Sequence, residues 1–332
     1  MSAPPTYRVD DRSILLPYYR RYLVDPVLPL LPASISPNWI THAGHASCFL
    51  AAMVLIAIWP SGGAPFAIAA LLLQIYIWCD NADGAHARRT GQTSPFGEYL
   101  DHGLDILNTV YMSFLTASAL GATPVGWISF VVLIPGAAAI VMWEQAATGV
   151  YRLGLINQIE SSIVLSAALL GSAIWERRIF EATQLFGIEL RLALLLWCAA
   201  TIVFGICHGV VRVARAAGVK NLGPAVVLVI FGGLSIFAVW RGALGVVPAV
   251  SIMTGVNVAF CARMLTSRLH RKMPRTMPTL WLVLAVVGSA VVFREINGEA
   301  VPSGIIAAAA VFVFAAQTLS DARVGFLSLA EA

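Results

Sequence analysis

Residues 64–83 read APFAIAALLLQIYIWCDNAD, an apolar run that ends in two aspartates. Such a run crosses a bilayer as a helix, because about 20 residues that each rise 1.5 Å match the thickness of the hydrocarbon. Nine similar runs are separated by short turns that are polar or contain proline or glycine. The sequence therefore predicts an all-α polytopic membrane protein with about ten transmembrane helices. They begin near Trp39, Pro65, Phe96, Gly126, Gln158, Leu190, Leu222, Ala243, Met277 and Pro302.

The composition excludes an ordinary soluble domain. Of the 332 residues, 59% are hydrophobic and only 11% are charged, and the mean hydropathy is +0.81. Soluble domains have about 25% charged residues. Residues 1–38 differ from the rest, because Asp10, Arg12 and Arg20 precede any apolar run. We expect this part to be an amphipathic cytoplasmic segment at the membrane interface and not a signal peptide.

The basic residues indicate topology rather than an anionic partner such as nucleic acid. The chain has 21 lysines and arginines and a net charge of +4. If the N-terminus and an even number of crossings are placed in the cytoplasm, most of the 21 fall on that side. This places the loop with Arg88 and Arg89 on the cytoplasmic face of the membrane.

Four of the eight aspartates lie on the two sides of that loop. Asp80 and Asp83 are three positions apart near the end of one helix, while Asp101 and Asp105 are four apart in the next, so each pair shares a helix face. Four carboxylates near hydrocarbon repel one another and lose hydration unless a cation lies between them. We expect two divalent ions, Mg²⁺ or Mn²⁺, because both prefer oxygen ligands.

The residues between the two pairs are suited to a phosphate. Glycine and alanine at several positions let the backbone approach a ligand, and Arg88 or Arg89 can bind a diphosphate through two hydrogen bonds. Ser94 or Thr93 can donate further hydrogen bonds. The alternative is structural, with the aspartates paired to Arg88, Arg89 and Arg152.

The spacing of these residues resembles, without a mismatch, the signature of the CDP-alcohol phosphotransferases. It reads Asp80-x-x-Asp83-Gly84-x-x-Ala87-Arg88, then eight residues, then Gly97-x-x-x-Asp101-x-x-x-Asp105. The longer string with Glu98 and His102 is similar to the choline/ethanolamine branch, although Ala85-His86 replaces a Lys-Gln pair common in its eukaryotic members. The resemblance covers about half of the chain, from Tyr7 to Ser166.

The resemblance implies roles for residues that their spacing alone does not assign. It implies that the four aspartates hold two divalent metals and that Arg88 binds the nucleotide diphosphate. Asn38 and Thr41 then line the nucleotide pocket. Gly84, Ala87, Ser94 and Gly97 belong to the same substrate-binding motif.

A hydroxyl acceptor that attacks the diphosphate needs a base, and the sequence offers two. Asp105 is suggested by the wider superfamily, but the cations would occupy its lone pairs. The imidazole of His102 has a suitable ordinary pKa near 6.5, and Glu98, four positions earlier, can orient the ring. The choline/ethanolamine branch points to His102 as well. A structural role for His102 is the third interpretation.

Outside the motif, Trp143 and Glu144 are candidate contacts for a cationic headgroup, through an aromatic face and a carboxylate. A packing role for the tryptophan is equally consistent. Glu160 has either a functional role or that of an acid at a helix start. We expect catalytic helices over residues 39–215. Residues 216–332 would add helices that build the cavity for a lipid acceptor or a contact such as a homodimer interface.

These observations favour transfer of phosphocholine or phosphoethanolamine from its CDP ester to diacylglycerol or a similar lipid alcohol, with release of CMP. One alternative is a phosphatidyltransferase that uses CDP-diacylglycerol and a small polar alcohol. Another, from a different class, is an ion-coupled transporter with an acidic site. The clustering of all four acids about one loop, with no internal repeat, argues against a transporter.

Overall fold

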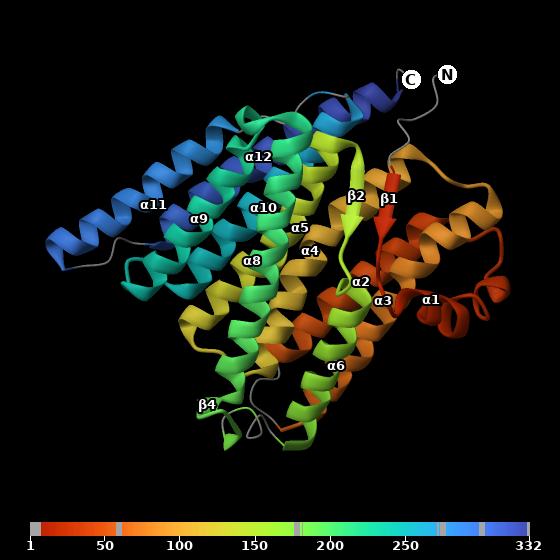
Figure 1. Cartoon of the computed structure of the whole chain (residues 1–332), viewed down its shortest axis with the longest axis horizontal. Coiled ribbons are helices and arrows are strands. Elements are labelled where there is room, and N and C mark those ends of the chain that lie inside the picture. The colour runs from red at the N-terminus through yellow and green to blue at the C-terminus, as the bar shows by residue number, and fades with distance from the viewer. Residues whose placement is uncertain are drawn as a thin grey trace. The chain divides into compact units, whose positions relative to one another are not determined.

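A computed structural model describes residues 8–57, 62–175, 180, 182–270, 272, 277–298 and 303–330 (Figure 1). Within these ranges the chain forms ten long helices. They are α2 (Pro37–Ala57), α3 (Ala64–Thr90), α4 (Pro95–Ala119), α5 (Pro124–Thr148), α6 (Gln158–Trp175), α8 (Leu190–Ala217), α9 (Gly223–Trp240), α10 (Val246–Leu269), α11 (Pro278–Asn297) and α12 (Ser303–Ala330). Each begins within a few residues of its expected start. The start expected at Pro302 lies just outside the described residues.

Short elements connect or precede the long helices. The N-terminal part forms β1 (Arg8–Asp11), α1 (Leu16–Tyr19), the π-helical turn η1 (Arg20–Val24) and the 3₁₀ turn η2 (Leu28–Leu30). The remaining short elements are β2 (Val150–Leu153), β3 (Gln184–Leu185), β4 (Ile188–Glu189) and the 3₁₀ turn η3 (Val219–Asn221).

Local sequence explains where several long helices begin and end. Ser94 and Thr123 cap α4 and α5, because each side-chain oxygen accepts a hydrogen bond from the backbone N–H three residues later. Helix α3 ends at Gly91, whose φ of 69° is left-handed and suits glycine. Adjacent residues therefore determine where α3 ends and where α4 begins, on the two sides of the loop between them.

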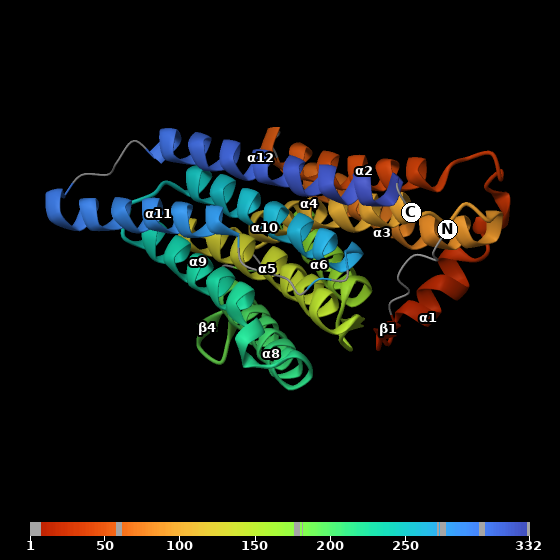
Figure 2. The same cartoon turned by 90° about the horizontal axis from the view of Figure 1, so that it is seen from above.

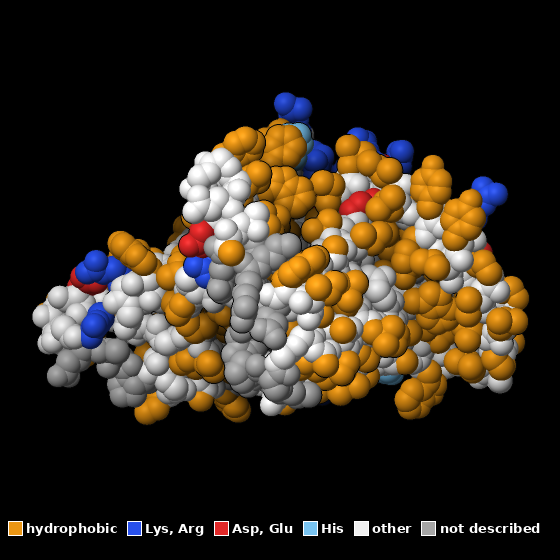
Figure 3. Space-filling model, turned by 90° about the horizontal axis from the view of Figure 1, so that it is seen from below, with side chains coloured by type: hydrophobic (Ala, Val, Ile, Leu, Met, Phe, Trp, Pro, Cys, Tyr) orange, Lys and Arg blue, Asp and Glu red, His pale blue; other side chains and the backbone are white. Residues whose placement is uncertain are grey.

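Nine of the described helices are long and apolar enough to cross a membrane. Helix α4 is not among them, although it has 25 residues. Acidic and polar side chains lower its hydropathy, and it packs against α2 and α6. Hydrophobic side chains cover much of the face shown in Figure 3, as expected of a surface in contact with lipid. The chain is an all-α polytopic membrane protein, as predicted.

The chain divides into two compact units. One comprises Asp10–Gly121 and Leu153–Leu196 and contains α2, α3, α4 and α6; here it is called the acidic unit. The other includes Ala122–Arg152 and Trp197–Ala332. In this second unit α10 packs against α5 and α12, and Figure 2 shows α10 and α12 side by side. The expected functional division of the chain near residue 215 stays a prediction.

The described part of the N-terminal segment packs on the acidic unit by one face, and its amphipathic character at a membrane interface stays a prediction. Tyr19, Val24 and Leu28 are buried in the core of the acidic unit, whereas Tyr18 and Tyr22 are exposed. The indole of Trp78 on α3 donates a hydrogen bond of 2.9 Å to the backbone oxygen of Leu23 in η1. The segment is therefore attached to α3 by one face and leaves aromatic rings on the other.

Helices α2 and α3 have the most extensive contact in the acidic unit, and Gly44 of α2 packs directly against Cys79 of α3. A Cβ atom placed on Gly44 would lie 2.8 Å from the Cβ of Cys79. This distance is shorter than two carbon atoms tolerate, so only glycine permits the two backbones to approach in this way.

We predict that Gly44→Ala destabilises the protein by about 1–3 kcal/mol, because α2 must move away from α3. Gly171→Ala in α6 is the matched control, since among the described residues its Cβ would meet only the Phe180 ring, at an ordinary 3.7 Å. Thermal unfolding in detergent should give a lower midpoint for Gly44→Ala and an equal or higher one for Gly171→Ala. Equal midpoints for Gly44→Ala and wild type would contradict the close packing.

Candidate active site

The last turns of α3 and the first turns of α4 bring four carboxylates together in the acidic unit. Asp80 lies within hydrogen-bonding reach of Asp105 and interacts electrostatically with Asp83. Asp101 is repelled by the charges of Asp83 and Asp80. The spacing within each helix and the turn between them are sufficient for this convergence. Asp83 is buried and the other three are partly buried. Four like charges in such positions repel one another and lose hydration unless a cation compensates them.

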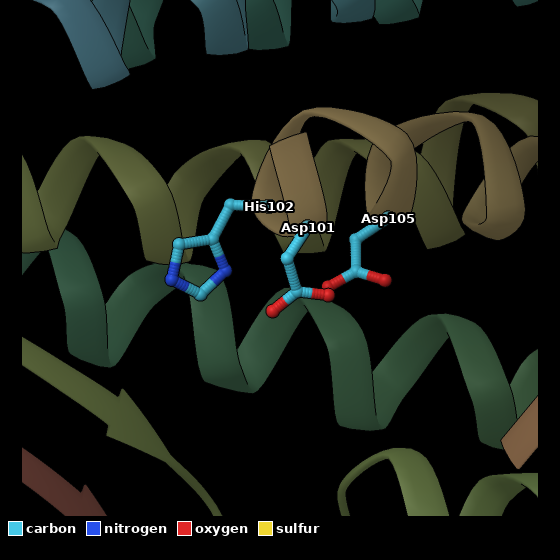
Figure 4. A group of neighbouring side chains, drawn as sticks. All are labelled: Asp101, His102 and Asp105. Atoms are coloured by element: carbon cyan, nitrogen blue, oxygen red, sulfur yellow. The ribbon is translucent and has the colours of Figure 1, made fainter. Parts of the chain in front are cut away.

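Three of the ligand-type side chains on α4 form a compact group. One oxygen or nitrogen each from Asp101, His102 and Asp105 lie within 4.8 Å of one another (Figure 4). The two carboxylates lie next to each other, with the imidazole of His102 beside that of Asp101. Carboxylate oxygens are the donors that Mg²⁺ and Mn²⁺ prefer. With Asp80 and Asp83 alongside, the donor set fits divalent cations.

Neighbouring side chains orient two of the carboxylates. Thr41 on α2 donates a hydrogen bond of 2.6 Å to Oδ2 of Asp83, while the backbone N–H of Gly84 donates to Oδ1. The hydroxyl of Tyr76 lies 3.3 Å from Oδ1 of Asp105 and accepts a hydrogen bond of 3.0 Å from Gln158. Such contacts restrict the direction of a metal ligand.

Tyr76 and Gln158 were not among the residues expected at the site. The signal for Tyr76 was present, since it precedes Asp80 by four positions and shares its helix face. Gln158 opens α6, and nothing in its local sequence indicates that it reaches Tyr76. Tyr19 is a third neighbour outside the motif, because burial and then the charge of Asp80 raise its pKa to about 12.

The candidate general base, His102, and its candidate partner, Glu98, lie on the first turns of α4. Nε2 of His102 is 3.9 Å from Oε1 of Glu98, with the imidazole largely buried and the carboxylate partly exposed. The separation of four residues puts both on one helix face. The carboxylate is close enough to stabilise an imidazolium electrostatically.

The candidate phosphate loop lies over the same ends of α3 and α4. Arg88 is exposed, but its guanidinium folds back so that Nη1 would be 3.4 Å from a Cβ on Gly84, and its charge acts on Asp83. Gly97 faces Asn38, because a Cβ on this glycine would lie 3.1 Å from Oδ1 of the asparagine. Ala87 is buried on α3. Ser94 accepts the capping hydrogen bond from Gly97, so its own hydroxyl proton remains to be donated.

The structural alternative pairs the four aspartates with nearby arginines, but two of those arginines have other partners. Arg89 donates a hydrogen bond of 2.7 Å to the backbone oxygen of Leu31 and one of 3.0 Å to His86. Arg152 donates to Glu144 at 2.8 Å. Two of the three arginines that could have neutralised the aspartates are therefore used elsewhere, which favours a functional acidic cluster.

Trp143 and Glu144 lie in the second unit, on α5. Trp143 is fully buried. Glu144 is also buried, and Arg212 on α8 donates to both of its oxygens at 2.6 and 2.7 Å. With the additional hydrogen bond from Arg152, this one carboxylate contacts two guanidinium groups. Arg212 lies 68 positions from Glu144, so no local pattern indicates this contact. The role of Trp143 and Glu144 toward a headgroup stays a prediction.

Glu160 has a structural role in the acidic unit. Its Oε1 accepts hydrogen bonds from the hydroxyl of Ser13 at 2.7 Å and from the backbone N–H groups of Ile14 and Leu15 at 2.9 Å. Its Oε2 accepts from the backbone N–H of Asn157, which precedes α6. Glu160 therefore joins the N-terminal segment to the start of α6.

Comparison with known proteins agrees with this geometry. The chain is 33% identical to cholinephosphotransferase 1 of Gallus gallus over 202 residues, 56% of this chain and 57% of the relative. It is 30% identical to cholinephosphotransferase 1 of Xenopus laevis over 234 residues, 66% of this chain and 56% of that protein. An uncharacterised CDP-alcohol phosphatidyltransferase class-I family protein of Dictyostelium discoideum is 33% identical over 188 residues, or 52% and 47%. The chain thus spans about half the length of the relatives that it matches.

The family comparison covers the acidic cluster and most of the helices around it. Residues 34–211 match the CDP-alcohol phosphatidyltransferase family, and they make up more than half of the 332 residues. All four aspartates, His102 and Arg88 lie inside the matched range. The chain therefore belongs to the CDP-alcohol phosphatidyltransferase family.

Proposed function

We propose that the protein transfers phosphocholine or phosphoethanolamine from its CDP ester to diacylglycerol or a similar lipid alcohol and releases CMP. The convergence of four carboxylates from α3 and α4, in the spacing of the family motif, carries this proposal. The names of the vertebrate relatives favour an aminoalcohol headgroup. The active site would face the cytoplasm, where the distribution of basic residues places Arg88. The oligomeric state, including a homodimer, stays a prediction.

Asp80, Asp83, Asp101 and Asp105 would hold two divalent cations, Mg²⁺ or Mn²⁺. The chemistry that such cations would supply is neutralisation of the negative charge on the diphosphate and on the departing CMP. Arg88 would bind the diphosphate, while Asn38 and Thr41 on the first turn of α2 line the nucleotide pocket. Gly84 and Gly97 leave space for the donor beside these side chains. Each group holds the donor in one position before the acceptor arrives.

His102 would remove the proton from the acceptor hydroxyl as that oxygen attacks the phosphorus. Glu98 then stabilises the imidazolium at a distance of 3.9 Å. Asp105 is the other candidate base, but its Oδ1 already faces the hydroxyl of Tyr76. A group oriented in this way suits a fixed ligand better than a proton carrier.

Purified protein tests the donor and acceptor directly. It is offered CDP-choline, CDP-ethanolamine or CDP-diacylglycerol with Mg²⁺, and CMP release is followed with diacylglycerol or small polar alcohols as acceptors. We expect release from the first two donors with the lipid acceptor. Release only from CDP-diacylglycerol would replace this function with phosphatidyl transfer, and no release from any donor would leave the transporter alternative.

Removal of the cations or of one carboxylate should abolish activity. We expect Asp80→Ala, Asp83→Ala and Asp101→Ala each to lose turnover without unfolding, because each carboxylate belongs to a shared site. Asp25→Ala, at an exposed position outside the site, is the control. CMP release is measured with and without excess EDTA. Full activity in EDTA, or in any of the three site variants, would refute the metal proposal.

Replacement of Arg88 by lysine should weaken donor binding. A lysine cannot reproduce two parallel hydrogen bonds to a diphosphate, so we expect Arg88→Lys to lose about tenfold or more in affinity. Arg215→Lys, at an exposed position near the end of α8, controls for the loss of a surface guanidinium. Calorimetry with CDP-choline measures both. Unchanged affinity in Arg88→Lys would remove Arg88 from the diphosphate site.

Two substitutions distinguish the candidate bases. His102→Ala should retain donor binding but lose about 10²–10⁴-fold in turnover, because no donor ligand has been removed. Glu98→Gln should lower turnover through the same step, so that the two defects overlap in the double variant. His42→Ala, an exposed histidine on α2, is the control. Near-normal turnover in His102→Ala would return the role to Asp105.

A further inference from the structure

Residues 31–36, here called the α2 strap, precede the first turn of α2 and are tied to the end of α3. Arg89 donates a hydrogen bond of 2.7 Å to the backbone oxygen of Leu31, and Gln92 donates one of 2.8 Å to that of Ala33. Nε2 of His86 lies 2.9 Å from the backbone oxygen of Ile35. Three side chains of seven consecutive residues therefore bind alternate carbonyl groups of the strap.

His86 is the centre of this attachment. It is fully buried, and both of its ring nitrogens have partners. The carbonyl oxygen of Ile35 can only accept, so Nε2 must carry the proton. Nδ1 is then an acceptor, and it receives the hydrogen bond of 3.0 Å from Arg89. The neutral imidazole thus joins Arg89 to the strap in one defined tautomer.

The same network separates the roles of two neighbouring arginines. Nη2 of Arg89 has two protons, and these match its two acceptors, Leu31 and His86. Arg88 is directed instead toward Gly84 and Asp83. Of the two arginines that the sequence offers for a diphosphate, Arg89 is therefore engaged in holding the strap.

The strap leads directly into the residues expected to bind the nucleotide. Asn38 faces Gly97 at the start of α4, and Thr41 donates its hydrogen bond of 2.6 Å to Asp83. The direction in which the chain enters α2 sets the position of both side chains. Because the strap contains only six residues, its anchors determine that direction.

We propose that His86, together with Arg89, is a positioning residue that shapes the donor pocket by fixing the α2 strap. This inference rests on the proposed function, since it takes Asn38 and Thr41 to be donor contacts. Loss of the anchor would let the first turn of α2 move. Donor binding would then have to order this turn again, and the lost entropy would weaken the affinity. Thr41 supports Asp83 from α2, but the helices α3 and α4 position all four aspartates, so affinity for the metal should fall much less than affinity for the donor.

Calorimetry with CDP-choline in Mg²⁺, without an acceptor, tests this role. His86→Leu removes both hydrogen bonds at similar volume and should weaken binding roughly tenfold. His86→Gln retains one donor and one acceptor and should recover part of the affinity. Arg89→Met, at an exposed position, removes the other anchor and should act in the same direction even if the buried substitution impairs folding. His42→Leu is the matched histidine control on α2.

Two further measurements separate positioning from general damage. Mn²⁺ affinity should stay within about threefold of wild type in every variant, and kcat at saturating donor should change far less than KM. Unchanged donor affinity in both His86→Leu and Arg89→Met would overturn the inference, as would a parallel loss of donor affinity, Mn²⁺ affinity and thermal stability. If wild type itself does not bind CDP-choline, the proposed function fails instead.

Discussion

Mutual repulsion among Asp80, Asp83, Asp101 and Asp105 is the constraint on which the acidic unit depends. Their carboxylates act on one another in partly buried surroundings, where charge is screened less than in water. Rigid helices are needed to keep such groups together, because a flexible loop would let them separate. The close contact of α2 with α3 at Gly44 supplies part of that rigidity. A bound cation would convert this unfavourable energy into binding energy.

Around the cluster, neutral hydrogen-bond donors hold the acids without cancelling their charge. Thr41 and Tyr76 contact Asp83 and Asp105 through hydroxyl groups. Arg89, which could have formed an ion pair, is turned toward the strap and His86. The acids thus keep their capacity to bind a metal, whereas a direct arginine partner would compete with it.

The buried acid of the second unit, Glu144, is paired with arginines. Glu144 is shared by Arg212 and Arg152, so two guanidinium groups contact one carboxylate. A cationic headgroup would have to compete with two guanidinium groups for this carboxylate. The contrast shows that a buried glutamate beside a tryptophan is insufficient evidence for a cation site, because distant arginines decide its surroundings.

The ten helices, the pairing of the acids on helix faces and the family motif can be predicted from sequence alone, since these depend on residues within a few positions of one another. Ser94 as a cap and Gly91 as a helix end are of the same kind. Which groups meet from distant segments depends instead on tertiary packing. It placed Gln158 against Tyr76, His86 against Ile35, Glu160 against Ser13 and Arg212 against Glu144. Such contacts arise when helices pack, and helical periodicity carries no information about which partner lies across an interface.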